Sequence, residues 1–113
     1  MNTETQKPIR EQLKHGLKAA MKARQNEVVS VLRSALSAID NAEAVPLDDS
    51  MVAVVGRLNE VPRKELSEED MRAIVQAEAD ALKTSIAGYQ SIGKLEEAEG
   101  LQTQWEALSQ YLF

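Results

Sequence analysis

The sequence has no cysteine, one histidine, three prolines and five glycines among its 113 residues. The lack of cysteine excludes disulfide scaffolds, thiolate metal sites and cysteine nucleophiles. A single histidine, His15, leaves no obvious metal site with two or three histidine ligands. With so few prolines and glycines, an all-β fold with its many turns is disfavoured. These absences remove most disulfide-rich, zinc-binding and β-sheet classes of protein.

Long apolar runs are absent as well, and none approaches the roughly 20 residues that span a bilayer. The polar start of the chain, residues 1–7, does not resemble a signal peptide. The formal net charge of −5 does not by itself point to a nucleic-acid partner. We therefore expect a soluble, cytoplasmic protein without a membrane partner.

Helix-forming residues are abundant. Ala, Glu, Leu, Lys and Arg account for 53 of the 113 residues, close to the half that is typical of long-helix sequences. The length suits one compact domain and not two. The composition predicts an all-α fold, with residues 1–113 forming a single helical domain.

Two stretches without proline, residues 9–45 and 63–113, are where helices can persist. In the first stretch, apolar residues at helical spacing predict one helix that opens at Pro8 and a second that runs from an Asn26 N-cap to about Glu43. The polar residues 24–26 form a short break, so the two helices should make an antiparallel αα-hairpin.

The second stretch opens with Ser67-Glu68-Glu69-Asp70, which resembles a capping box. It predicts one long helix that ends at Gly93, a suitable C′ residue. Apolar residues at 98, 101, 105, 108 and 112 predict a last helix packed against it. In all, we expect a small bundle of about four helices in two αα-hairpins. Tyr89 and Trp105 fall on apolar stripes, which places them in the core.

The middle of the chain, residues 44–66, is harder to interpret. Residues 45–50 are typical of a turn, and the apolar run at 51–55 is compatible with a strand or a helical turn. A lone strand would be only marginally stable. We predict a loop here, a mobile central linker, because its length for a compact domain indicates either mobility or contact with a partner.

Basic residues at intervals of four mark the first helix: Arg10, Lys14, Lys18 and Lys22. Side chains at i and i+4 are neighbours, so these four predict one basic ridge. Residues 1–27 carry a net charge of +3 and residues 28–113 a net charge of −8. The ridge is therefore a candidate strip for nucleic-acid phosphates. The alternative is an ordinary solvated helix face.

Two charged residues border apolar stripes, Arg33 on the second helix and Glu78 on the long helix. An unpaired charge in a protein interior costs several kcal/mol. We predict that Arg33 forms a structural ion pair with Glu78, or with another carboxylate across the bundle.

Catalytic and metal-binding patterns are not recognised. His15 should be a solvated surface residue, because it points away from the apolar stripe. The acidic clusters at residues 68–70 and 96–99 are explained by helix capping and a solvated first turn. The Glu-x-x-His motifs of di-metal bundles are missing. We expect no catalytic residue, no metal and no cofactor.

The sequence finishes on Tyr111-Leu112-Phe113. These apolar residues either fold back on the bundle or form a tip that binds a partner. The sequence leaves both possibilities open, together with the oligomeric state.

Several stretches form one ordered series of motifs: Leu17–Arg24, Val31–Arg33, Ala38–Glu43 and Val61–Asp70. The series continues with Glu78, Tyr89, Gly93-Lys94, Leu108 and Tyr111-Leu112. In this order and spacing, the chain resembles the GatB/YqeY family over nearly its whole length, and most of all the short, actinobacterial-type (YqeY-like) members.

The resemblance implies an all-helical protein related to the B subunit of glutamine-dependent tRNA amidotransferases. Those enzymes correct mischarged Glu-tRNA(Gln) or Asp-tRNA(Asn), and the C-terminal helical and tail regions of the B subunit contact the tRNA. The family is labelled with carbon–nitrogen ligase activity that uses glutamine as amide donor. The kinase-like catalytic module of the B subunit has no counterpart in this sequence. The resemblance therefore implies a non-catalytic accessory module that contacts tRNA or an amidotransferase subunit.

This sequence departs from the family pattern in three places. Longer relatives continue beyond the Tyr-Leu pair with a helical tail domain, whereas this sequence stops at Phe113. Gln104 stands where many relatives have Glu, and Lys94 where Arg is common. Two other functions stay open: a protein-interaction module with no nucleic-acid role, and glutamine-dependent amide transfer by the isolated chain.

Overall fold

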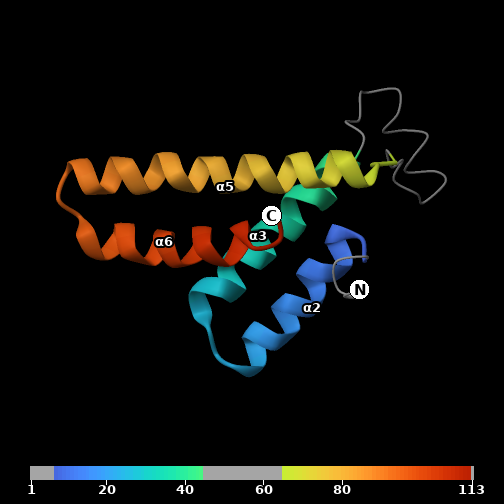
Figure 1. Cartoon of the computed structure of the whole chain (residues 1–113), viewed down its shortest axis with the longest axis horizontal. Coiled ribbons are helices and arrows are strands. Elements are labelled where there is room, and N and C mark those ends of the chain that lie inside the picture. The colour runs from blue at the N-terminus through green and yellow to red at the C-terminus, as the bar shows by residue number, and fades with distance from the viewer. Residues whose placement is uncertain (1–6, 45–64, 113) are drawn as a thin grey trace, which may run out of the picture.

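The computed structural model describes residues 7–44 and 65–112, and all of the regular elements in these two ranges are helices. They are α2 (Ile9–Lys22), α3 (Asn26–Glu43), α5 (Glu68–Ser91) and α6 (Leu95–Ser109). The α2–α3 and α5–α6 pairs are the two αα-hairpins predicted from the sequence, and the small all-α bundle is confirmed (Figure 1). Most of the predicted linker, residues 45–64, lies outside the described residues.

The core lies where the two hairpins meet. Helix α3 packs against α2, α5 and α6, so it is the central element of the bundle. The largest fully buried side chains come from all four helices: Ile9, Leu13, Leu32, Ile39, Val75 and Leu108. Trp105 is half-buried and packs against this core, with Lys83 Nζ 4.7 Å from its ring centroid. The apolar stripes predicted from spacing are therefore the packing surfaces.

Both hairpins turn through the same backbone motif. In α5–α6, the Gly93 N–H donates to the Gln90 carbonyl at 3.1 Å and the Lys94 N–H to the Tyr89 carbonyl at 2.9 Å. This Schellman pattern needs a left-handed residue at C′, and Gly93 has a φ of 76°. The predicted end of the long helix at Gly93 is confirmed.

In the α2–α3 turn, the left-handed position is occupied by Arg24, with a φ of 56°. Its N–H donates to the Met21 carbonyl at 3.2 Å, and the Gln25 N–H donates to the Ala20 carbonyl at 3.0 Å. A residue with a side chain in this region costs roughly 1–2 kcal/mol, which glycine would avoid. The turn therefore holds one strained, exposed arginine.

Helix starts agree with the sequence only in part. Ser67 Oγ accepts from the Asp70 N–H at 3.0 Å, and Asp70 Oδ2 accepts from the Ser67 N–H at 3.1 Å, so the predicted capping box is confirmed. Pro8 is the N-cap of α2 rather than its first residue. The N-cap of α3 is Gln25, one residue before the predicted Asn26, and it makes no side-chain cap bond.

The first helix is capped by another helix. The Ile9 N–H donates to both carboxylate oxygens of Glu68, at 2.9 and 3.1 Å. Arg72 Nε donates to Glu68 Oε2 at 2.9 Å, and Arg72 Nη1 donates to the Tyr111 carbonyl at 3.3 Å. Because Pro8 has no polar side chain to cap the helix, the first turn of α5 fixes the start of α2.

Near the end of the chain, Tyr111 and Leu112 fold back and pack against the core. Helix α6 stops at Ser109, earlier than the predicted stripe, and hydrogen-bonded turns carry the backbone on to Leu112. The Tyr111 ring lies against Gly16 of α2, where an added Cβ would meet the Tyr111 hydroxyl and lie 3.0 Å from its Cζ. Of the two possibilities for this apolar end, folding back is the one observed, while Phe113 lies outside the described residues.

Candidate functional site

The basic ridge predicted on α2 has three exposed members. Lys14, Lys18 and Lys22 are all exposed along one helix, and we call these three residues the lysine strip. Because 3.6 residues make a turn, each step of four residues rotates by about 40°, so the strip winds slowly around α2. His15 is exposed on the same helix, as expected.

Arg10, the fourth predicted member, does not belong to the strip. Its Nη2 lies 2.7 Å from Glu43 Oε1 and 3.9 Å from Asp40 Oδ1, and its side chain is only 24% exposed. Three steps of about 40° turn Arg10 well away from the direction of Lys22 and toward α3. Arg10 therefore ties α2 to the end of α3 and does not share the exposure of the three lysines, and a contact of Arg10 with phosphates stays a prediction.

Glu78 is linked to α3 by a hydrogen bond from Ser34 rather than by the predicted ion pair with Arg33. Glu78 Oε2 accepts a hydrogen bond from Ser34 Oγ at 3.1 Å. Arg33 is exposed, and within residues 7–44 and 65–112 no ion pair joins it to Glu78. Successive helical residues differ by about 100° in direction, so the neighbour of Arg33 reaches α5 instead. The two helices are linked here by a hydroxyl rather than a guanidinium.

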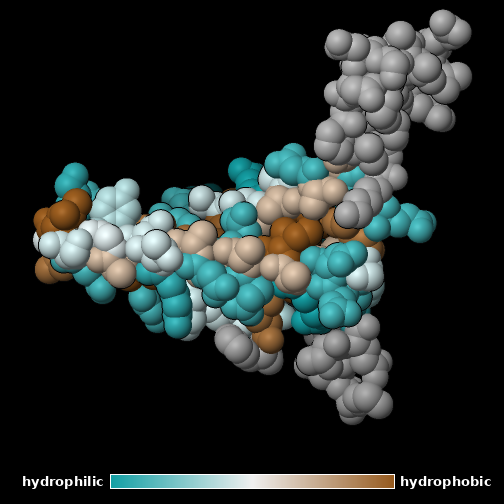
Figure 2. Space-filling model, turned by 90° about the horizontal axis from the view of Figure 1, so that it is seen from above, coloured by the Kyte–Doolittle hydropathy of each residue, from teal (hydrophilic) through white to brown (hydrophobic). Residues whose placement is uncertain are grey.

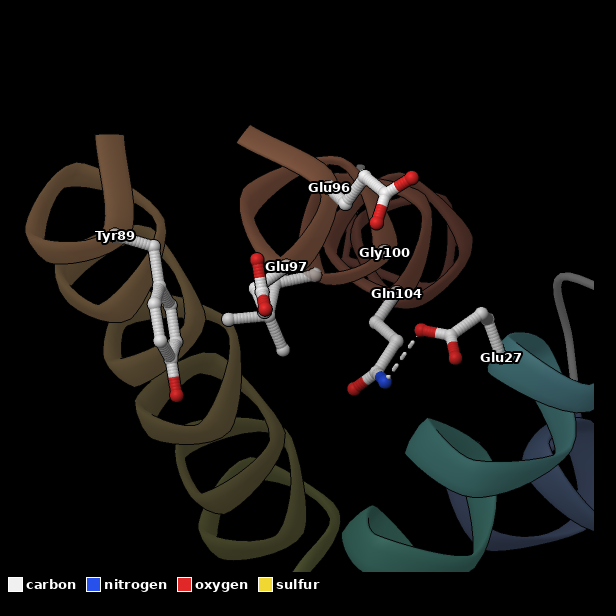
Figure 3. Close-up of a pocket in the computed structure, with 7 residues that line it drawn as sticks. Glu27, Tyr89, Glu96, Glu97, Gly100 and Gln104 are labelled. Carbon is white, nitrogen blue, oxygen red and sulfur yellow. Dashed lines mark hydrogen bonds between the residues drawn. The ribbon is translucent and has the colours of Figure 1, made fainter. Parts of the chain in front are cut away.

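An acidic hollow opens between the α5–α6 hairpin and the start of α3 (Figure 3). It has a volume of about 330 Å³ and is lined by Glu27, Tyr89, Glu96, Glu97, Gly100, Leu101 and Gln104. Gln104 Nε2 donates to Glu27 Oε2 at 2.9 Å and so links α6 to α3. A Cβ at residue 100 would lie 3.0 Å from the same Glu27 oxygen, so Gly100 lets this carboxylate approach closely.

Sequence reasoning missed this hollow, although its residues were visible. The sequence alone predicts only a solvated first turn for Glu96 and Glu97, and Gln104 stands out only as a departure from the family pattern. The third carboxylate, Glu27, comes from another helix 77 residues before Gln104. No local spacing reveals that contact.

Apolar side chains are exposed where α5 turns into α6. Ile92 and Leu95 are each 66% exposed, and Tyr89 is 37% exposed. Figure 2 shows hydrophobic atoms at that end of the long hairpin, beyond the region where the other helices cover it. The placement of Tyr89 in the core was wrong, because the apolar period of α5 continues beyond the reach of α3 (Figure 1). Met21, 50% exposed, lies near the other hairpin turn.

Within residues 7–44 and 65–112, no group of three or more His, Cys, Asp or Glu side chains is arranged to hold a metal ion. Among the same residues, every helix is too short or too polar to cross a membrane.

Comparisons with family models, curated proteins and solved structures find no match for this chain. The resemblance to the GatB/YqeY family accordingly stays a prediction from the sequence motifs.

Proposed function

We propose that the chain is a non-catalytic helical accessory module, related to the B subunit of glutamine-dependent tRNA amidotransferases, that binds tRNA through the lysine strip. The observation that carries the proposal is the exposure of Lys14, Lys18 and Lys22 along one helix. The motif resemblance supplies the choice of tRNA among nucleic acids.

The helix that carries the lysine strip is anchored to two other helices. At its N-terminal end, α2 is held to α3 by the Arg10–Glu43 ion pair and to α5 by the bond from the Ile9 N–H to Glu68. Lysines four apart are spaced by about 6 Å along the axis, so the three charges extend over about 12 Å. A fixed helix presents these charges together, whereas lysines on a mobile segment would first have to be ordered.

The distribution of charge along the chain favours the approach of a polyanion to α2. Residues 28–113 carry a net charge of −8, which repels phosphates, while residues 1–27 carry +3. A polyanion is therefore steered toward α2 and away from the α5–α6 hairpin.

Three lysines make a weak and salt-dependent contact. Each neutralised phosphate contributes about 0.7–0.9 to the slope of log affinity against log salt, so the strip predicts a slope of about −2 to −3. Binding should be measurable at low salt and fade at moderate salt.

The test is a titration of labelled tRNA with the wild type and with Lys14→Gln/Lys18→Gln/Lys22→Gln. We expect the triple variant to lose about tenfold or more in affinity at low salt and most of its salt slope. The matched control is Arg33→Gln/Lys83→Gln/Lys94→Gln, which removes the same charge from three exposed residues elsewhere; since Lys83 also lies over Trp105, circular dichroism checks that this variant folds. The control should bind tRNA as the wild type does, and equal losses in the two triple variants would reject the strip.

The non-catalytic half of the proposal has a separate test. Highly purified protein incubated with glutamine should release no ammonia above the rate in buffer. Release that co-purifies with the chain and scales with its concentration would revive the amide-transfer alternative.

A further inference from the structure

The exposed apolar residues at the end of the α5–α6 hairpin are not needed by the turn itself. The turn is closed by the N–H groups of Gly93 and Lys94 and by the positive φ of Gly93. Ile92 and Leu95 flank these residues and leave two thirds of their surface in solvent. Single exposed apolar residues are common, but two large ones beside an exposed tyrosine form a patch at one end of the molecule.

This patch is continuous with the acidic hollow, because Tyr89 belongs to both. Three glutamates are among the residues that line the hollow, Glu27, Glu96 and Glu97 (Figure 3). Residues 84–113 contain four glutamates and one basic residue, Lys94, so this end of the molecule is acidic. The volume of about 330 Å³ is at the lower end of the range for ligand pockets, roughly 300–1,000 Å³.

We propose that this hairpin end, defined by Tyr89, Ile92, Leu95 and the adjacent acidic hollow, is a docking surface for a basic, apolar segment of another polypeptide. The apolar side chains of the segment cover Ile92 and Leu95. A lysine or arginine of the segment enters the hollow and pairs with its carboxylates. This surface is separate from the lysine strip and does not depend on the tRNA proposal.

The charge of the surface selects this partner over others. A purely apolar partner would cover carboxylates without pairing them, which costs free energy. Nucleic acids and anionic lipids are repelled by the same carboxylates. A second copy that presents its own hairpin end would bring like charges together. A segment with both basic and apolar side chains can cover the apolar patch and pair with the carboxylates of the hollow at the same time.

The probe is a short synthetic amphipathic helix made only of leucine and lysine, and its affinity for the full chain is measured by calorimetry. Ile92→Ser/Leu95→Ser should weaken binding about tenfold or more, because the apolar contact is lost. Glu96→Gln/Glu97→Gln should weaken it about three- to tenfold, because the cation loses its partners. All four side chains are exposed, so the variants should fold normally, which circular dichroism checks.

A matched control distinguishes binding at the hairpin end from the general attraction of a basic peptide to an acidic protein. Glu65→Gln/Glu69→Gln removes two exposed carboxylates near the start of α5, about 35 Å from its far end at 1.5 Å per residue. That distance exceeds the screening length of about 8 Å at physiological salt, so affinity should change less than twofold. In amide NMR spectra, adding the peptide should change the chemical shifts of Gly93 and Gly100 and leave the chemical shift of Gly16 unchanged.

Four outcomes would overturn the proposal. The first is equal binding by the corresponding leucine–glutamate peptide, and the second is equal loss of affinity in the control and in the hairpin-end variants. The third is tRNA shifting Gly93 and Gly100, which would make the occupant a nucleic acid. The last is self-association of the chain that Ile92→Ser/Leu95→Ser abolishes, which would make the occupant a second copy carrying its own lysines and Met21.

Discussion

At the residue scale, two described glycines in helices have opposite surroundings. Gly16 of α2 faces the Tyr111 ring, and an added Cβ would meet its hydroxyl. Gly88 of α5 has nothing within 4 Å of the position of a Cβ. Glycine inside a helix costs about 1 kcal/mol relative to alanine. The same substitution should therefore have opposite effects at the two positions.

We predict that Gly16→Ala destabilises the protein by about 1–2 kcal/mol, because displacing the Tyr111 ring outweighs the gain in helix propensity. Gly88→Ala should stabilise it by about 1 kcal/mol. Urea unfolding of both variants measures the two free energies. In a Tyr111→Phe background the penalty at residue 16 should shrink, since the hydroxyl that the Cβ meets is gone; an unchanged penalty would contradict this explanation.

At the element scale, the start of α2 depends on a side chain from α5. Glu68 accepts the first N–H of α2 and also the Nε of Arg72. Its neighbour Glu69 occupies the same acidic first turn of α5 but is exposed. The two glutamates share their interaction with the helix dipole and differ in the cap on Ile9 and the Arg72 ion pair, which only Glu68 provides.

Glu68→Ala should therefore cost about 1–2 kcal/mol, the usual range for losing an N-cap acceptor, in the free energy of unfolding. Glu69→Ala should cost only a few tenths of a kcal/mol, which is the dipole contribution alone. Thermal unfolding of the two variants side by side measures the difference. Equal losses would mean that neither the bond from the Ile9 N–H to Glu68 nor the Arg72–Glu68 ion pair stabilises the protein.

The helices themselves could be predicted from the sequence, because their signals are local. The Ser67–Asp70 capping box, Gly93 at C′ and the apolar stripes each lie within one helix or turn. The cap on Ile9 could not be predicted, since Glu68 is 59 residues away. Spacing by four predicts a ridge that includes Arg10, but such a row winds around the helix, so Arg10 faces the end of α3 instead.

At the scale of the whole molecule, helix α3 touches the three other described helices, while the end of the α5–α6 hairpin extends beyond it (Figure 1). This arrangement explains why Tyr89 and Ile92 continue an apolar period and yet are exposed. A periodic pattern states which face of a helix is apolar but not how far the neighbouring helices reach. The candidate docking surface therefore became visible only in the assembled bundle.

The same arrangement predicts a gradient of local stability. Amides at residues 31–39 of α3 should exchange with solvent at least about tenfold more slowly than those at residues 87–91 of α5, because opening α3 disrupts its packing against all three other described helices. Native-state hydrogen exchange followed by NMR measures both sets. Equal protection would mean that the hairpin end opens only together with the whole domain.

The contact between Tyr111 and Gly16 joins the last described turn to the first described helix. Chains are made from the N-terminus, and N-terminal segments begin to fold first during synthesis. In the nascent α2–α3 hairpin, the side of α2 at Gly16 therefore stays uncovered until residue 111 has emerged from the ribosome. During that interval, the surface that Tyr111 later covers is exposed to other aromatic side chains, including those of neighbouring nascent chains.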